Sequence, residues 1–167
     1  MSGSATKHPS PRAHGRAIRK PARAAAPSLG ALYRLDAVER IKLVKQGVPA
    51  TVVDRLSKDM AIGKAKLYET LGLAPATVNR KLRDAQLLSQ DDSERVLGIA
   101  RLIGQVEQMV HESGDPKGFK AAEWVASWLD RPHPALDGKR PAELMDTADG
   151  RNLVSDLLAR MQSSAYA

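Results

Sequence analysis

Residues 64–83 read KAKLYETLGLAPATVNRKLR, and this stretch decides the fold. Its apolar residues recur at helical spacing on both sides of Gly72, the residue type that most readily turns a chain left-handed after a helix. Ala74 occupies the expected N-cap of the second segment, although it lacks a capping oxygen. The stretch predicts two short helices joined by a tight turn, the helix-turn-helix arrangement. The side chains expected to pack between the two helices are Leu67, Leu71, Leu73, Val78 and Leu82.

The second of these helices presents polar side chains on the face opposite its apolar residues. Arginine suits guanine, asparagine suits adenine, and the threonine methyl group suits thymine. We therefore predict that Thr77, Asn79 and Arg80 face bases in a DNA groove. The alternative interpretation is an ordinary helical hairpin with a charged outer face. The full set predicted to face DNA, with Lys81 or Arg83 directed at phosphates, is Ala76, Thr77, Asn79, Arg80, Lys81 and Arg83.

Helical periodicity continues on both sides of this stretch, and strand-like alternation is scarce. Two helices are expected before it, one from about Asp36 to Gly47 and one from Pro49 to near Asp59. After it, Ser89 is expected to cap a long helix that is apolar along one face. Trp124 and Trp128, one turn apart, indicate core or interface packing in the next helix. We predict an all-α protein with a flexible basic N-terminal arm at 1–35, a helix-turn-helix DNA-binding domain at 36–88 and a small helical domain at 89–167.

Charge is distributed unevenly along the chain. Residues 1–35 carry seven basic and no acidic side chains, residues 36–90 carry ten and six, and residues 91–167 carry nine and thirteen. A basic front and an acidic rear indicate two different partners, with polyanions attracted to the first half only. No apolar run approaches the roughly 18 residues that a membrane-spanning helix needs. We therefore expect a cytoplasmic protein with no membrane partner.

The sequence offers little for catalysis or metal binding. It contains no cysteine, which excludes disulfides and thiolate zinc sites. Of its four histidines, His8 and His14 lie in the N-terminal arm, and we expect a structural role for all four rather than metal binding. No glycine-rich phosphate loop, nucleophile elbow or His-Glu-x-x-His motif occurs. We expect no enzymatic activity, cofactor or metal. One competing hypothesis is a one-component transcriptional regulator whose C-terminal domain binds a small ligand.

The C-terminal half carries patterns more specific than periodicity. Residues 88–95 read LSQDDSER, and residues 128–160 read WLDRPHPALDGKRPAELMDTADGRNLVSDLLAR. Together with the helix-turn-helix, these motifs resemble the Xre/MbcA/ParS family of toxin-binding antitoxins, and most of all the Xre antitoxin that pairs with a RES-domain toxin. The family pattern Asn-Pro-x-Leu-Gly-Gly-x-Thr-Pro is matched except at His133, Asp137 and Arg140. These departures predict a changed dihedral and a lost N-cap in that loop.

The resemblance implies an antitoxin without a catalytic role that binds its own promoter as a dimer or larger assembly. Its C-terminal domain is expected to cover the active-site cleft of a RES toxin that consumes NAD or uses it for ADP-ribosylation. The implied partners are therefore a cognate RES-domain toxin, operator DNA and a second copy of the chain. We expect the stripe Leu153, Val154 and Leu157 to lie in the core. The residues expected to bind the toxin are Arg151, Asp156, Arg160, Met161, Gln162, Tyr166 and the terminal Ala167.

Overall fold

The computed structural model describes residues 29–114 and 116–165, with side chains placed as far as residue 163. All regular elements assigned in these ranges are helices. The β pairing found there is one isolated antiparallel bridge between Pro49 and Leu87. The all-α prediction is therefore confirmed. Residues 1–28, most of the expected basic arm, lie outside the described residues. No helix in the described part of the chain is long and apolar enough to cross a membrane.

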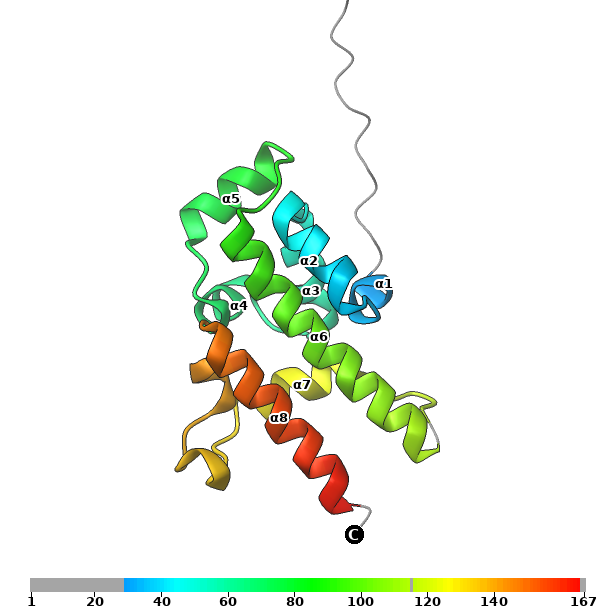
Figure 1. The fold of residues 1–167 in the computed structure, drawn as a ribbon. Helices are drawn as coiled ribbons and strands as arrows, with labels where there is room; N and C mark the ends of the chain where they lie inside the picture. Colours follow the sequence, from blue (N-terminus) through cyan, green and yellow to red (C-terminus); the bar gives the residue numbers. More distant parts are fainter. Residues whose placement is uncertain (1–28, 115, 166–167) are drawn as a thin grey trace, which may run out of the picture.

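Within the described residues, five helices precede the longest one (Figure 1). Their bounds are α1 (Leu29–Tyr33), α2 (Ala37–Gln46), α3 (Thr51–Asp59), α4 (Lys64–Leu71) and α5 (Pro75–Arg83). The helix-turn-helix is confirmed, because Gly72 ends α4 in the left-handed conformation (φ 61°) that glycine adopts at little cost. Val78 and three of the four leucines predicted to pack there are buried, whereas Leu82 is half-buried.

α6 (Gln90–Ser113) is the longest helix, and helices from both halves of the chain pack against it (Figure 1). Its start is capped as predicted, since Ser89 Oγ accepts a hydrogen bond of 3.1 Å from the backbone N–H of Asp92. The domain boundary that we expected at residue 88 thus falls at the start of a shared helix. The two halves are built on one continuous element.

The C-terminal half adds two helices and two short 3-10 turns. Their bounds are α7 (Ala121–Leu129), η1 (Pro134–Leu136), η2 (Pro141–Leu144) and α8 (Ala148–Ala165). Thr147 Oγ accepts a hydrogen bond of 3.1 Å from the backbone N–H of Gly150, which satisfies a free donor in the first turn of α8. The apolar stripe at Leu153, Val154 and Leu157 predicts a last helix beginning near Thr147, and α8 confirms it.

α1 corrects the extent of the expected arm. We assigned residues 29–33 to the flexible segment, yet Leu29, Leu32 and Tyr33 are buried against α6. The reason is a close approach: a Cβ added at Gly104 of α6 would overlap the carbonyl oxygen of Tyr33. The folded part of the chain therefore begins before residue 35.

Two expectations about the C-terminal half concern the burial of apolar residues in α8 and the loop that precedes it. Val154 and Leu157 are buried as predicted, but Leu153 is 46% exposed, so its assignment to the core is wrong. In the loop before α8, Asp137 has a φ of 53°, within the left-handed region that glycine commonly occupies. The change of dihedral expected relative to the family stays a prediction. His133 Nδ1 accepts a hydrogen bond of 3.2 Å from the backbone N–H of Ala135, which holds the start of the same loop.

The close approach of α1 to α6 is testable through Gly104. In an exposed helix interior, glycine to alanine stabilises a protein by roughly 0.5 to 1 kcal/mol. Here the methyl group must displace the backbone of α1, and overpacking of this kind costs about 1 to 3 kcal/mol. We expect Gly104→Ala to lower the free energy of unfolding, measured by urea denaturation. Gly63→Ala is the control, because open space surrounds that position. Greater stability of Gly104→Ala would show that α1 does not pack there.

Candidate functional site

The outer face of α5 carries the residues predicted to face DNA. Ala76, Asn79, Arg80 and Arg83 are exposed, Thr77 and Lys81 are half-buried, and Val78 between them is fully buried. The exposed positions recur every three or four residues, so they share one side of the helix. The last turn of α5 is basic, and no acid lies in its first turn. The helix thus presents a polar, cationic surface away from the core.

Asn79 is held in place by the preceding helix. The hydroxyl of Tyr68, on α4, donates a hydrogen bond of 2.9 Å to Asn79 Oδ1. Burial raises the pKa of Tyr68 above its usual value, so the phenol remains a donor at neutral pH. Asn79 keeps its amide N–H groups for another partner. This link across the turn joins residues eleven positions apart, and sequence reasoning did not anticipate it.

The turn between α4 and α5 is braced by the rest of the molecule. Arg95 Nη1, on α6, donates a hydrogen bond of 2.6 Å to the carbonyl oxygen of Gly72. A Cβ added at Gly72 would also lie 3.0 Å from the Cβ of Asp146, in the segment just before α8. The turn is therefore in contact with both α6 and the C-terminal half.

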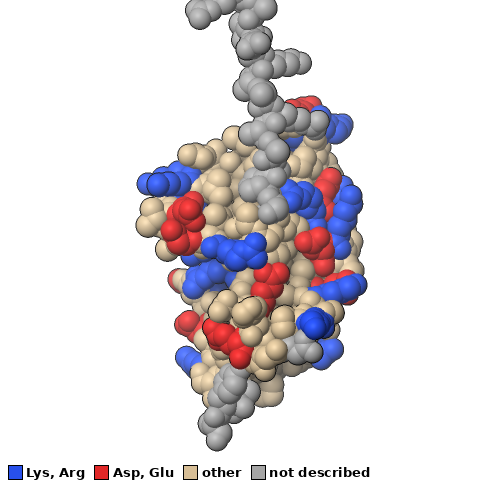
Figure 2. Space-filling model, turned by 90° about the vertical axis from the view of Figure 1, so that its right-hand side faces the viewer, with Lys and Arg blue, Asp and Glu red and all other residues tan. Residues whose placement is uncertain are grey.

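The face beside α1 and α2 has a different electrostatic character. In Figure 2, which views the side lying to the right in Figure 1, Lys and Arg side chains alternate with Asp and Glu. A mixed surface does not produce the strong positive field that attracts a polyanion. The part of this face seen in the figure is thus a poorer DNA surface than the outer face of α5.

On α8 the predicted toxin-binding residues fall into separate groups. Asp156 and Arg160 are exposed, and the exposed Leu153 lies on the same side of the helix because the spacings are three and four residues. Met161 and Gln162 are half-buried, and Gln162 Nε2 donates a hydrogen bond of 2.9 Å to Glu112 of α6. Tyr166 and Ala167 lie outside the described residues. We refer to Leu153, Asp156 and Arg160 as the α8 stripe.

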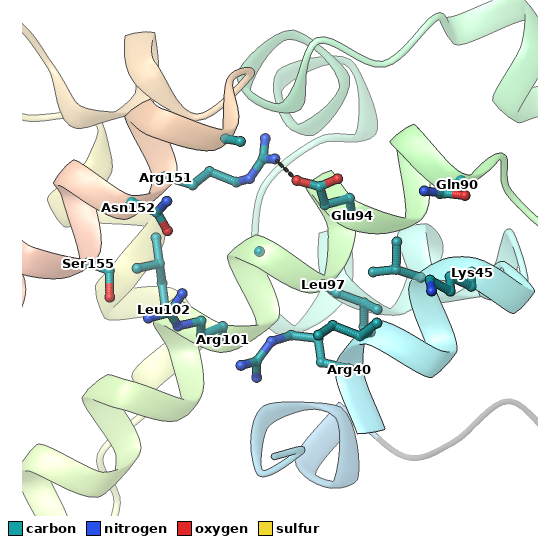
Figure 3. Close-up of a pocket in the computed structure, with 14 residues that line it drawn as sticks. Arg40, Lys45, Gln90, Glu94, Leu97, Arg101, Leu102, Arg151, Asn152 and Ser155 are labelled. Atoms are coloured by element: carbon teal, nitrogen blue, oxygen red, sulfur yellow. Dashed lines mark hydrogen bonds and ion pairs between the residues drawn. The ribbon is translucent and has the colours of Figure 1, made fainter. Parts of the chain in front are cut away.

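Arg151 has a different environment from the α8 stripe. Its side chain is only 9% exposed, and its guanidinium donates to the carbonyl oxygen of Met145 at 3.1 Å and to Glu94 Oε1 at 3.0 Å (Figure 3). Gly98 of α6 makes room for it, since a Cβ there would lie 2.5 Å from Arg151 Cδ. We expected Arg151 to enter a toxin cleft, whereas the structure shows it bonded within the chain. It fastens α8 to α6.

Two family models match the chain. The antitoxin Xre-like helix-turn-helix domain matches residues 39–101, and the antitoxin Xre/MbcA/ParS C-terminal toxin-binding domain matches residues 114–163. A relative named Prs ADP-ribosylating antitoxin, from a Sphingobium species, is 47% identical over 137 residues, which cover 82% of this chain and 86% of the relative. This chain belongs to the Xre/MbcA/ParS family of antitoxins.

More distant relatives agree with this assignment. A protein named Antitoxin Xre from Photorhabdus laumondii is 23% identical over 72% of this chain and 76% of its own length. Another of the same name, from Yersinia enterocolitica, is 24% identical over 74% of this chain and 78% of its own length. The resemblance seen in the sequence is confirmed. The matched helix-turn-helix domain extends well into α6, which fits the shared position of that helix.

The toxin-binding domain of this antitoxin also contains an aromatic cluster. Trp124 and Trp128 are stacked, with ring centroids 6.0 Å apart and planes 9° from parallel. Phe119 and His133 extend the cluster at either end, with centroids 6.5 Å from Trp124 and 6.2 Å from Trp128. Trp128 is buried and Phe119 is 39% exposed. The tryptophans therefore pack as predicted. The contacts of Phe119 and His133 with them were not predicted from the sequence.

Metal binding has no visible basis in the described residues of the antitoxin, where no group of three or more His, Cys, Asp and Glu side chains is placed to hold an ion. The outer face of α5 lies in the matched helix-turn-helix domain and the α8 stripe in the matched toxin-binding domain. Their two matched domains indicate DNA and a toxin as the partner classes.

The role of Arg151 can be tested by Arg151→Met, which keeps much of the side-chain volume. Hydrogen bonds to charged groups contribute about 1.5 to 3 kcal/mol each, and the carbonyl of Met145 would lose its donor. We expect the antitoxin to lose roughly 1 to 3 kcal/mol of stability in urea denaturation. Arg160→Met is the matched control on the exposed side of the same helix. Equal denaturation midpoints for the two variants would argue against the fastening role.

Proposed function

We propose that this antitoxin neutralises a RES-domain toxin, one that uses NAD for ADP-ribosylation, by covering its active site with α8 and the following tail. The observation that carries the proposal is the α8 stripe, which exposes a leucine beside two charged residues within the matched toxin-binding domain. An exposed apolar anchor surrounded by polar groups is typical of a protein-binding surface. The name of the Sphingobium relative, Prs ADP-ribosylating antitoxin, supports ADP-ribosylation as the chemistry of the toxin.

We further propose that the antitoxin represses its own operon through α5. The exposed Asn79 and Arg80 are the side chains that we assign to bases, and Arg83 with the half-buried Lys81 to phosphates. Helix-turn-helix proteins bind operators as two-fold dimers with half-sites about one helical turn apart. We therefore propose a homodimer on DNA, within a larger complex when toxin is present. No cofactor takes part in either role.

The α8 stripe is tested by Leu153→Asp. A carboxylate at an apolar anchor is desolvated without a partner when the interface closes, so binding is expected to weaken by about 100-fold or more. Because Leu153 is exposed in the free antitoxin, its stability should be nearly unchanged. The measurements are the dissociation constant for the purified cognate toxin, and the cellular NAD level when antitoxin and toxin are co-expressed.

Leu87→Asp is the matched control, since Leu87 is a similarly exposed leucine (49%) in the DNA-binding half. It should leave toxin affinity intact. Equal toxin affinity of the two variants would exclude the α8 stripe as the docking surface. If the α8 stripe binds the toxin but the toxin alone leaves the cellular NAD level unchanged, the proposed NAD-using chemistry is wrong.

Operator binding is tested by Arg80→Ala. One base-reading arginine contributes about 1 to 3 kcal/mol of specific DNA affinity. We expect a loss of that size for the promoter fragment of the operon in gel-shift titrations at constant salt, with little change for unrelated DNA. Arg131→Ala, an exposed arginine of the toxin-binding half, controls for total charge. Unchanged promoter affinity for Arg80→Ala would place the reading surface elsewhere.

A further inference from the structure

A cleft lies between α2, α6 and α8, and its lining includes no residue of either proposed binding surface. It has a volume of about 300 Å³ and is lined by residues of α2, α6 and the first turns of α8 (Figure 3). Its walls therefore come from both the DNA-binding half and the toxin-binding half. This volume lies at the lower end of the range of about 300 to 1,000 Å³ that is typical of small-molecule pockets.

The cleft is strongly cationic. Arg40 and Lys45 of α2, Arg101 of α6 and Arg151 of α8 all line it, whereas Glu94 is its one acidic lining residue. Glu94 is already paired with Arg151 at 3.0 Å. The remaining three cations thus lack a carboxylate in the lining to balance them. A concave surface with excess charge of one sign concentrates ions of the opposite sign.

Arg40 and Arg101 form the most favourable anion-binding pair in this cleft. Neither makes a salt bridge to a carboxylate among the described residues, and Arg40 Nη1 donates only to the carbonyl oxygen of Leu35 at 2.9 Å. Burial, and then the like charge of Arg101, lower the pKa of Arg40 below its usual value, against a smaller opposing effect of the Asp36 carboxylate. The two guanidinium groups therefore repel each other, and a phosphate between them would relieve that repulsion.

A second hollow supports the same location. It continues past Arg40, Arg101 and Ser155, which line both spaces, and is more open, with a volume of about 560 Å³. Arg34 adds a further cation on that side and Asp156 of the α8 stripe adds an acid, so the lining of this hollow carries three arginines against one carboxylate. The arginine pair thus lies where an enclosed cleft meets an open hollow, so an anionic group can reach it from solvent.

The rest of the enclosed cleft is apolar with a few hydrogen-bonding groups. Ile41 and Val44 of α2 contribute its accessible apolar lining, with the buried Leu97 and Leu102 beneath them, and Asn152 and Ser155 contribute polar atoms from α8. A flat, mostly apolar group such as a nucleobase matches this combination, since its faces pack against aliphatic side chains and its edge accepts hydrogen bonds. Inorganic phosphate would use the arginine pair alone and leave this lining empty.

We propose that this cleft binds a small phosphorylated molecule of the mononucleotide class, with its phosphate between Arg40 and Arg101 and its base against Ile41 and Val44. A ligand in this position contacts α2 and α8 together, so it stabilises the arrangement of the two halves by linkage. The inference stands on the geometry of the cleft and does not depend on the identity of the toxin.

The test is isothermal titration of the full-length antitoxin with AMP and, separately, with inorganic phosphate at equal ionic strength. We expect AMP to bind, phosphate to bind more weakly, and Arg101→Ala to weaken AMP binding by about 10-fold or more, the effect of losing one charge-assisted hydrogen bond. Arg101→Lys should retain part of the affinity. Arg131→Ala, which removes the same charge outside the cleft, should bind AMP as the unmodified antitoxin does.

Several results would overturn the proposal. Absence of AMP binding to the unmodified antitoxin would do so, as would equal affinities of Arg101→Ala and Arg131→Ala. Phosphate binding as tight as AMP binding would rule out the nucleotide class, because the apolar lining would then contribute nothing. If Arg101→Ala weakens the toxin complex and AMP does not bind, the cleft is a protein-docking surface instead. Thermal unfolding of each variant checks that the fold is intact.

Discussion

The buried guanidinium of Arg151 is the contact on which the two halves of this antitoxin depend. It donates to the carbonyl of Met145 and to Glu94 and lies against Gly98, so it joins the segment before α8, α8 itself and α6. Moving a charge out of water is costly unless partners replace the water. Arg151 is stable in this position because both partners and the space above Gly98 are present together. The position of α8 is consequently set by an electrostatic contact as well as by apolar packing.

Neighbouring residues of α6 connect this contact to the DNA-binding turn. Glu94 bonds to Arg151, while Arg95, the next residue, donates to the carbonyl of Gly72. A second link is exposed: Asp130, at the end of α7, accepts from Lys66 of α4 at 3.0 Å. Exposed ion pairs contribute little, at most about 1 kcal/mol. The relation between the two proposed binding surfaces therefore rests mainly on α6.

The elements that the sequence predicted correctly have local signals. Gly72 ends α4, Ser89 caps α6 and Thr147 precedes α8, and each acts on backbone groups within a few residues of itself. The outer face of α5 follows equally from a helical repeat anchored by the buried Val78. These features depend on residues close to one another along the chain, so the sequence alone is sufficient to predict them.

The features that were missed depend on distant partners. Arg151 and Glu94 are 57 residues apart, and α1 is buried because Gly104, more than 70 residues later, leaves room for it. Helical periodicity predicted that α8 has an apolar face, but not which residues lie at the border of that face. Adjacent residues on a helix point about 100° apart, so Leu153 and Val154 do not both face α6. Only the packed structure decides which of them is buried.

The exposed position of Leu153 has an energetic meaning for the free antitoxin. Fully burying a leucine side chain contributes about 1.5 to 3 kcal/mol, and much of that gain remains unused while Leu153 stays in water. A partner that covers it recovers this free energy without disturbing Val154 or Leu158, which already hold α8 in the core. Because Arg151 fixes the same helix from the other side, little ordering cost accompanies docking. Under the proposed function, the helix is thus ordered before the toxin docks on it.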